Sequence, residues 1–130
     1  MLIADNLTIS KEIVYIYENT DMEPIKIKNK WKWGYAVTII AEGCGIVAVD
    51  FNEGYEWGYI NSLTVHQSRR RQGIGTRLME EAEKVIKEEG FDEAQLRVEK
   101  EHTFQKEWYE RLGYKTIVTE EAYYKMRKIF

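Results

Sequence analysis

The sequence predicts an α+β fold built on one mixed β-sheet (an α/β mixed sheet), and three observations support this. Short runs rich in β-branched and aromatic residues recur along the chain, with glycine-rich turns between them. Two segments in the second half show helical periodicity, and each ends at a glycine. A strand lies between these two helices. Such a strand–helix–strand unit among hairpins requires parallel and antiparallel pairing in the same sheet.

The first 34 residues give the weakest signal. The run "EIVYIY" at 12–17 predicts a strand, because it is short, apolar and partly β-branched. The stretch 18–34 has no clear period, and we expect a loop with a short helix there.

An antiparallel meander follows. Two β-branched runs flank the turn residues Glu42-Gly43-Cys44-Gly45, which is typical of a hairpin. A second turn and a third strand complete the meander, so that we expect strands at 35–41 and 45–51, a turn at 52–58 and a strand at 59–65.

The second half alternates helices and strands. The first helix has one apolar face and a second face of glutamates and lysines, and Gly90 closes it. Gly113 closes the second helix in the same way. The expected elements are helix 74–89, strand 93–99, helix 103–113 and strands 114–119 and 122–130. With the N-terminal segment included, the order is roughly β-(α)-β-β-β-α-β-α-β-β.

Composition limits the function classes. A length of 130 residues predicts a single domain over 1–130. The net charge of −3 argues against a general nucleic-acid binder. A single cysteine, Cys44, excludes an internal disulfide and a multi-cysteine zinc site, and we expect no metal. The N-terminus lacks a signal-peptide pattern and no apolar run approaches the roughly 20 residues that span a bilayer, so we expect a cytoplasmic protein without membrane contact.

The stretch "SRRRQGIGTRLM" at 68–79 places three arginines and a Gly73-x-Gly75 turn at the start of the first helix. A helix N-terminus has free N–H groups and a partial positive charge, glycines let a ligand approach the backbone, and arginine matches phosphate oxygens. This pattern predicts a site for a phosphate-bearing ligand. Alternatively, the arginines are a solvated run. The pattern is not a P-loop, since no Gly-Lys pair follows, and Leu78 replaces the third glycine of the dinucleotide fingerprint.

The motif Arg70-x-x-Gly73-x-Gly75 after the strand "INSLTV" resembles the acyl-CoA-binding signature of the GNAT superfamily of N-acyltransferases. The segment "LRVEKEHTFQKEWYERLGY" is similar to the next strand and helix of that family, and "YYKMRK" to its last strand. The resemblance covers about residues 35–130 and implies a GNAT-like acyl-CoA N-acyltransferase fold. Residues 1–34 match poorly.

The resemblance also implies the residues that bind acetyl-CoA. In the family the fourth strand splays from its neighbour, and its backbone pairs with the pantetheine amides. That role falls to Leu63, Thr64 and Val65, whose side chains can still be core residues. The pyrophosphate is expected on backbone N–H groups, with arginine side chains beside the phosphates; the residues implied are Arg70, Arg71, Gln72, Gly73, Ile74, Gly75 and Thr76. His102 stands where an asparagine commonly contacts the cofactor; it is either a similar donor or a solvated helix-start residue.

Tyr109 matches the tyrosine that often protonates the thiolate of CoA, and its alternative is a core aromatic residue. The glutamate that serves some members as general base is replaced by Tyr59, which leaves the base open among Asp50, Glu53 and Glu56, with Asn61 able to order a water. The N–H of Val65 is the natural donor to the carbonyl oxygen.

The implied function is direct transfer of an acetyl group from acetyl-CoA to a primary amine. The acceptor cannot be read from the residues, because residues 1–34 correspond to the segment that usually shapes its pocket. Two other classes stay open: a CoA-binding sensor without activity, and a nucleic-acid-binding domain, which the glutamate-rich helix disfavours. The sequence does not decide whether the chain forms a homodimer.

Overall fold

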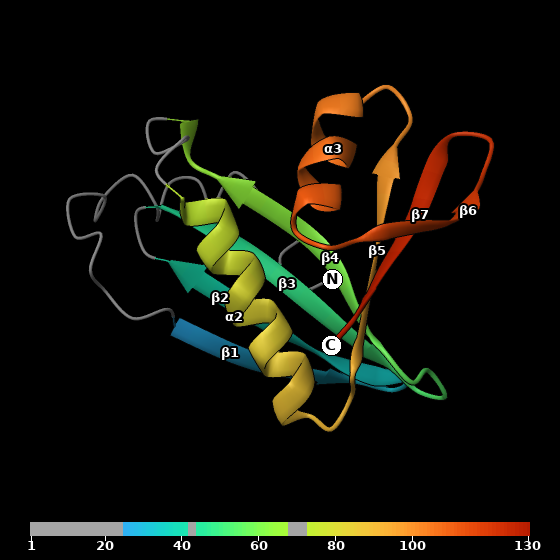
Figure 1. Ribbon diagram of the computed structural model, residues 1–130. Coiled ribbons are helices and arrows are strands. Elements are labelled where there is room, and N and C mark those ends of the chain that lie inside the picture. The colour runs from blue at the N-terminus through green and yellow to red at the C-terminus, as the bar shows by residue number, and fades with distance from the viewer. Residues whose placement is uncertain (1–24, 42–43, 68–72) are drawn as a thin grey trace.

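The computed structural model describes residues 25–41, 44–67 and 73–130, and these form one twisted sheet with two helices on its front face (Figure 1). The order confirms the mixed α+β class. The elements are β1 (Ile25–Trp31), β2 (Gly34–Ala41), β3 (Gly45–Asn52), β4 (Gly58–Val65), α2 (Ile74–Glu88), β5 (Glu93–Glu99), α3 (Thr103–Arg111), β6 (Lys115–Thr119) and β7 (Tyr123–Ile129).

The expectation of a loop with a short helix at 18–34 is wrong for its last part, because residues 25–31 form strand β1. The run "IKIKNKW" alternates lysine with other residues, which is the period of a strand. Pairing with β2 along its whole length stabilises this polar edge strand, and the pairing is a tertiary contact that periodicity alone understates. The strand expected at 12–17 lies outside the described residues.

The seven strands lie in the order β1-β2-β3-β4-β5-β7-β6. All neighbours are antiparallel except β4 and β5, which are parallel. The parallel pair is short, since only Gly58 with Ala94 and Tyr59 with Gln95 are in register. Beyond these pairs the two strands separate, and this separation opens the sheet in its middle.

The main core lies between the sheet and α2, which crosses the front of β2, β3 and β4 (Figure 1). Leu78, Met79 and Ile86 of the helix are almost completely buried. They pack against valines and isoleucines of the sheet, because β-branched side chains fill a pleated surface well. Since this core fixes α2, it also fixes the position of the helix N-terminus above β4.

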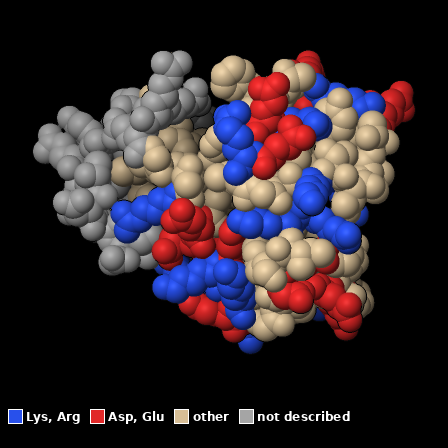
Figure 2. Space-filling view, in the orientation of Figure 1, with Lys and Arg blue, Asp and Glu red and all other residues tan. Residues whose placement is uncertain are grey.

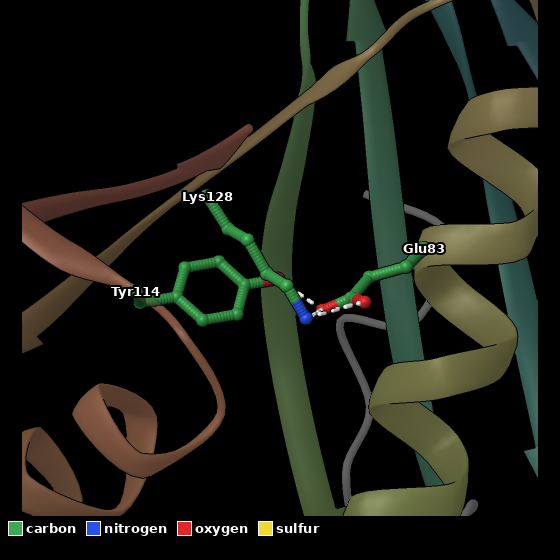
Figure 3. Close-up of polar contacts among 3 residues, drawn as sticks. All are labelled: Glu83, Tyr114 and Lys128. Carbon is green, nitrogen blue, oxygen red and sulfur yellow. Dashed lines mark hydrogen bonds and ion pairs between the residues drawn. The ribbon is translucent and has the colours of Figure 1, made fainter. Parts of the chain in front are cut away.

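A buried polar cluster joins α2 to the C-terminal strands (Figure 3). The Tyr114 hydroxyl donates to Oε2 of Glu83 at 2.9 Å, and Nζ of Lys128 donates to both carboxylate oxygens of Glu83 at 3.0 and 3.3 Å. Tyr114 and Glu83 are both buried. Because a buried carboxylate is costly without partners, these contacts specify how the last strands dock on the helix.

Candidate functional site

A cleft of about 510 Å³ lies between β4, the N-terminus of α2 and one face of α3. Its lining comes from these three elements, which are far apart in sequence. The residues are Leu63, Thr64, Val65, Gly73, Ile74, Gly75, Thr76, Gln105, Trp108 and Tyr109. The structure therefore brings together eight of the residues that the sequence predicted for the site.

The N-terminus of α2 is open to a ligand. Gly73 caps the helix in the left-handed region at φ 77°, ψ 7°, without a side-chain capping bond, and the first turn has no acidic residue. The bond from Arg77 N to Gly73 O, 3.0 Å long, marks the start of the helical ladder. The backbone N–H groups that precede Arg77 in the first turn therefore take no part in the hydrogen bonds between residues i and i−4 of the helix. This makes the N-terminus of α2 suitable for binding an anion.

A small residue at position 75 keeps this end accessible. A Cβ atom on Gly75 would lie 3.4 Å from the Trp108 ring and 3.6 Å from the Val65 side chain. A methyl group would fit at ordinary contact distance. Larger branches would fill the space between α2 and α3.

Within the described residues, the second half of the β4 edge that faces β5 pairs with no other strand. The His66 N–H donates to Cys44 O at 2.6 Å, toward β3. Successive backbone groups in a strand point to opposite sides, so the N–H groups of Val65 and Leu63 point to the side where β5 has separated. The polar backbone of this edge thus faces the cleft.

Helix α3 closes the cleft on its far side with Gln105, Trp108 and Tyr109. Burial raises the pKa of Tyr109 to about 12, so the hydroxyl keeps its proton throughout the physiological range. Trp108 lies against Tyr109 with a ring-centroid distance of 5.0 Å. Neither Gln105 nor Trp108 was among the residues predicted for the site. Gln105 lies three residues before Trp108 and four before Tyr109, so the three side chains lie on one face of α3. This spacing is the sequence signal that indicates Gln105 and Trp108 as site residues.

The other four predicted binding residues are Arg70, Arg71, Gln72 and His102. The first three lie outside the described residues, whereas His102 is the exposed N-cap residue of α3, and its Nε2 lies 3.6 Å from Oε2 of Glu99.

A second group of polar residues lies where β4 and β5 begin to separate. The register of β3 and β4 shifts between Ala48 and Val49, which pair with Ser62 and Ile60, so that Asn61 lies at a β-bulge. Its Nδ2 donates to Oδ2 of Asp50 at 2.8 Å. Burial raises the pKa of the Asp50 carboxyl, and the bond from Asn61 offsets only part of that rise.

Burial distinguishes Asp50 from Glu53 and Glu56, the two other acidic residues considered as the general base. Asp50 is partly buried on β3 and is the cross-strand partner of Tyr59. Glu53 and Glu56 are exposed residues of the β3–β4 turn. Burial also raises the pKa of Tyr59, which stands at the position of the expected glutamate and is neutral at physiological pH.

Charges over the helical face are mixed. Figure 2 shows Lys and Arg side chains interspersed with Asp and Glu over its described part, without a continuous basic stripe. Within the described residues, no group of three or more His, Cys, Asp or Glu side chains could hold a metal ion. None of the described helices is long and apolar enough to cross a membrane.

A family model for the "Acetyltransferase (GNAT) family" matches residues 14–114, which is most of the chain. The chain belongs to the GNAT acetyltransferase family. The resemblance seen in the Arg-x-x-Gly-x-Gly motif is thereby confirmed, as is the GNAT-like fold. A search of curated proteins gave no significant match.

Solved GNAT structures share the fold at low sequence identity. The PaiA N-acetyltransferase of Thermoplasma acidophilum, in complex with coenzyme A, is 22% identical with a TM-score of 0.63, over 73% of this chain and 60% of that one. A GNAT acetyltransferase of Elizabethkingia anophelis with acetyl-CoA bound is 14% identical with a TM-score of 0.63, over 75% and 76%. A Bacillus subtilis acetyltransferase in complex with CoA is 12% identical with a TM-score of 0.64, over 83% and 99%. The chain thus spans less than two thirds of the Thermoplasma protein.

Proposed function

We propose that this GNAT protein transfers an acetyl group from acetyl-CoA to a primary amine. One observation carries the proposal: a single cleft combines the open N-terminus of α2, the unpaired edge of β4 and the Tyr109 side chain. These groups match the three parts of the co-substrate. The helix end suits the pyrophosphate, the strand edge suits the pantetheine amides, and Tyr109 suits the thioester sulfur. CoA or acetyl-CoA in related structures supports the same co-substrate.

The amine must lose a proton to attack the thioester carbon. An amine with a pKa near 10 is only about 0.1% neutral at pH 7, so a nearby base increases the rate. We assign this role to Asp50. Its raised pKa brings it closer to the working pH, and the Asn61 amide fixes one carboxylate oxygen. The base thus stands on β3, one strand away from the position that Tyr59 occupies on β4.

In the reaction the amine nitrogen bonds to the carbonyl carbon, the proton goes to Asp50 and the C–S bond breaks. The N–H of Val65 points to the open edge and is placed to donate to the carbonyl oxygen as charge develops there. The Tyr109 hydroxyl donates to the departing sulfur. A phenol with a pKa of about 12 is a weaker acid than a thiol of pKa near 8.5, so Tyr109 stabilises the thiolate through a hydrogen bond and does not fully transfer its proton.

Replacement of Tyr109 by phenylalanine is therefore expected to lower kcat by roughly 10- to 100-fold, the cost of one hydrogen bond to a charged group. The ring keeps its contacts with Trp108, so the melting temperature and the Kd of acetyl-CoA should change little. Steady-state kinetics that follow CoA release, together with a melting curve, measure both effects.

The control for this substitution is Tyr35→Phe, which removes a phenol hydroxyl on β2, where the ring stacks on Phe51 away from the cleft. Its kcat should match the wild type. If Tyr109→Phe also keeps full kcat, Tyr109 has no catalytic role.

Acetyl-CoA binding gives the test of the cleft itself. Gly73→Val is expected to raise the Kd of acetyl-CoA by at least about 30-fold, because a β-branched residue disfavours the left-handed backbone at the N-terminus of α2 and its side chain enters the cleft. Isothermal titration calorimetry measures the change.

The other end of the same helix offers a matched control. Gly90 also has a positive φ, 95°, and a Cβ atom at either glycine would lie within 4 Å of no described residue beyond its immediate surroundings in the chain. Gly90→Val therefore has a similar backbone strain but lies outside the cleft lining, and its Kd should stay within about 3-fold of the wild type. Equal affinities for both variants would contradict the proposed binding mode.

A further inference from the structure

A second cavity, of about 220 Å³, opens on the face of the sheet opposite to α2. Its lining residues are Asn52, Tyr55, Trp57, Tyr59, Gln95, Arg97 and Lys125. Strand alternation places it: Ile60, Leu96 and Met126 belong to the core under the helices, so Tyr59, Arg97 and Lys125, their neighbours in sequence, face the other way. The cavity therefore lies next to the place where β4 and β5 separate. The first cleft lies on the other face of the sheet at the same separation.

Among the described residues, one buried hydrogen-bond acceptor that lines this cavity has no partner. Gln95 is 4% exposed, and its Nε2 donates to Oε2 of Glu93 at 2.6 Å. Its Oε1 is buried and has no hydrogen-bond partner within the described part of the chain. A buried amide oxygen in this state costs free energy, and a ligand with an N–H or O–H donor would recover it.

Two cations face each other at the rim. Arg97 on β5 and Lys125 on β7 are direct cross-strand partners, and both line the cavity. Like charges at such positions destabilise a sheet. Oε1 of Glu120 lies 3.3 Å from Nε of Arg97, and the Arg97 side chain stays about half-exposed, so its guanidinium remains accessible to a carboxylate. Within the described residues Lys125 has no ion pair, and its Nζ lies 5.8 Å from the centre of the Trp57 ring.

An aromatic wall completes the cavity. The rings of Tyr55 and Trp57 are stacked, with centroids 4.9 Å apart and planes at 18°, and Tyr55 remains half-exposed. Such a flat surface favours a planar group through offset stacking. Asp50 lies on the neighbouring strand β3 and is the cross-strand partner of Tyr59, which lines the cavity.

From this arrangement we infer that the acceptor is a small amine that carries a carboxylate and an aromatic group, as an aromatic amino acid does. Arg97 and Lys125 bind the carboxylate, Tyr55 and Trp57 stack on the ring, and the amine lies toward Asp50. The size of the cavity suits a small molecule better than a protein surface. The inference deepens the proposed function and rests on it for the assignment of the amine to acetyl transfer.

Matched pairs of amines with and without the carboxylate give the test. Tyrosine and tyramine, and tryptophan and tryptamine, differ only in this group. For the wild type with saturating acetyl-CoA, we expect kcat/KM for the amino acid to exceed that for its decarboxylated partner by at least about 10-fold, the effect of a hydrogen bond to a charged group. The difference should appear in KM. Decarboxylated amines that react equally well or better would overturn the inference.

Charge-removing variants locate the effect. Arg97→Gln and Lys125→Gln should each raise KM for tyrosine by about 10-fold and leave KM for tyramine within 2-fold. Lys115→Gln removes an exposed cation of β6 that does not line the cavity, and it should change neither. Equal losses for both amines in the Arg97 and Lys125 variants would contradict a carboxylate site.

Direct binding separates this inference from the proposed function. Calorimetric titration of tyrosine into the protein, with CoA present and absent, reports on the second cavity alone. Tyrosine binding that depends on Arg97 and Lys125 supports the cavity assignment even if no acetyl transfer is observed. Acetyl-CoA binding without any tyrosine binding or turnover would overturn the assignment and leave the first cleft standing.

Discussion

Replacement of Asp50 by asparagine is expected to lower kcat/KM for an accepted amine by about 10²–10⁴, the usual contribution of a general base. Asparagine keeps the size of the side chain, and its Oδ1 can still accept the bond from Asn61, so the loss reports on proton transfer. Steady-state kinetics at pH 7 measure it. The exposed turn residue Glu53 gives the control, and Glu53→Gln should be as active as the wild type.

The pH profile sharpens this prediction. Asp50 acts only when ionised, so log kcat/KM of the wild type should rise with pH through the raised pKa of this carboxyl and then level off. The Asp50→Asn variant should lose that limb. An identical profile at reduced rate would mean that Asp50 only shapes the site.

The contribution of Asp50 to the stability of the fold should fall as the pH rises, in the opposite direction to its contribution to activity. The folded-state pKa of Asp50 is raised, so its contribution to stability is present below the unfolded pKa near 3.9 and is lost as the pH rises through the folded value. At pH 7 the ionised carboxylate is therefore a net cost to the fold. The melting temperature of Asp50→Asn should equal or exceed that of the wild type, whereas a lower one would assign Asp50 a structural role.

Truncation of Glu83 is expected to have the largest effect on the fold. In Glu83→Ala the Tyr114 hydroxyl and the Lys128 ammonium lose their shared acceptor, and breaking a buried pair costs about 3–5 kcal/mol. Lys128 keeps some contact with water, so we expect about 3 kcal/mol and a fall of roughly 10 °C in melting temperature. Urea unfolding and calorimetric scanning measure both.

An exposed ion pair calibrates this result. Lys106 and Glu110 lie 3.3 Å apart on the surface of α3, at i and i+4. Glu110→Ala should cost only about 0.3–0.5 kcal/mol. A similar small loss in Glu83→Ala would show that the buried cluster contributes no more than a surface pair.

Local patterns in the sequence were sufficient for most of the elements. The strands from residue 35 onward and both helices lie within a few residues of their predicted bounds, because apolar periodicity and closing glycines are local signals. The Gly73-x-Gly75 motif likewise predicted an anion site at the start of α2 from local chemistry alone. Strand β1 was missed, since "IKIKNKW" is strongly polar and its stability comes from pairing with β2.

The sequence by itself thus determined the fold class, the family resemblance and one half of the site. Only the tertiary structure decided which acidic residue is the candidate base, because Asp50 differs from Glu53 and Glu56 in burial and in its bond from Asn61, not in its local sequence. It also decided that Arg97 and Lys125 face each other over Gln95. These residues lie 28 positions apart along the chain, and only the pairing of β5 with β7 brings them together. Contacts of this kind depend on register and burial, which are properties of the assembled sheet.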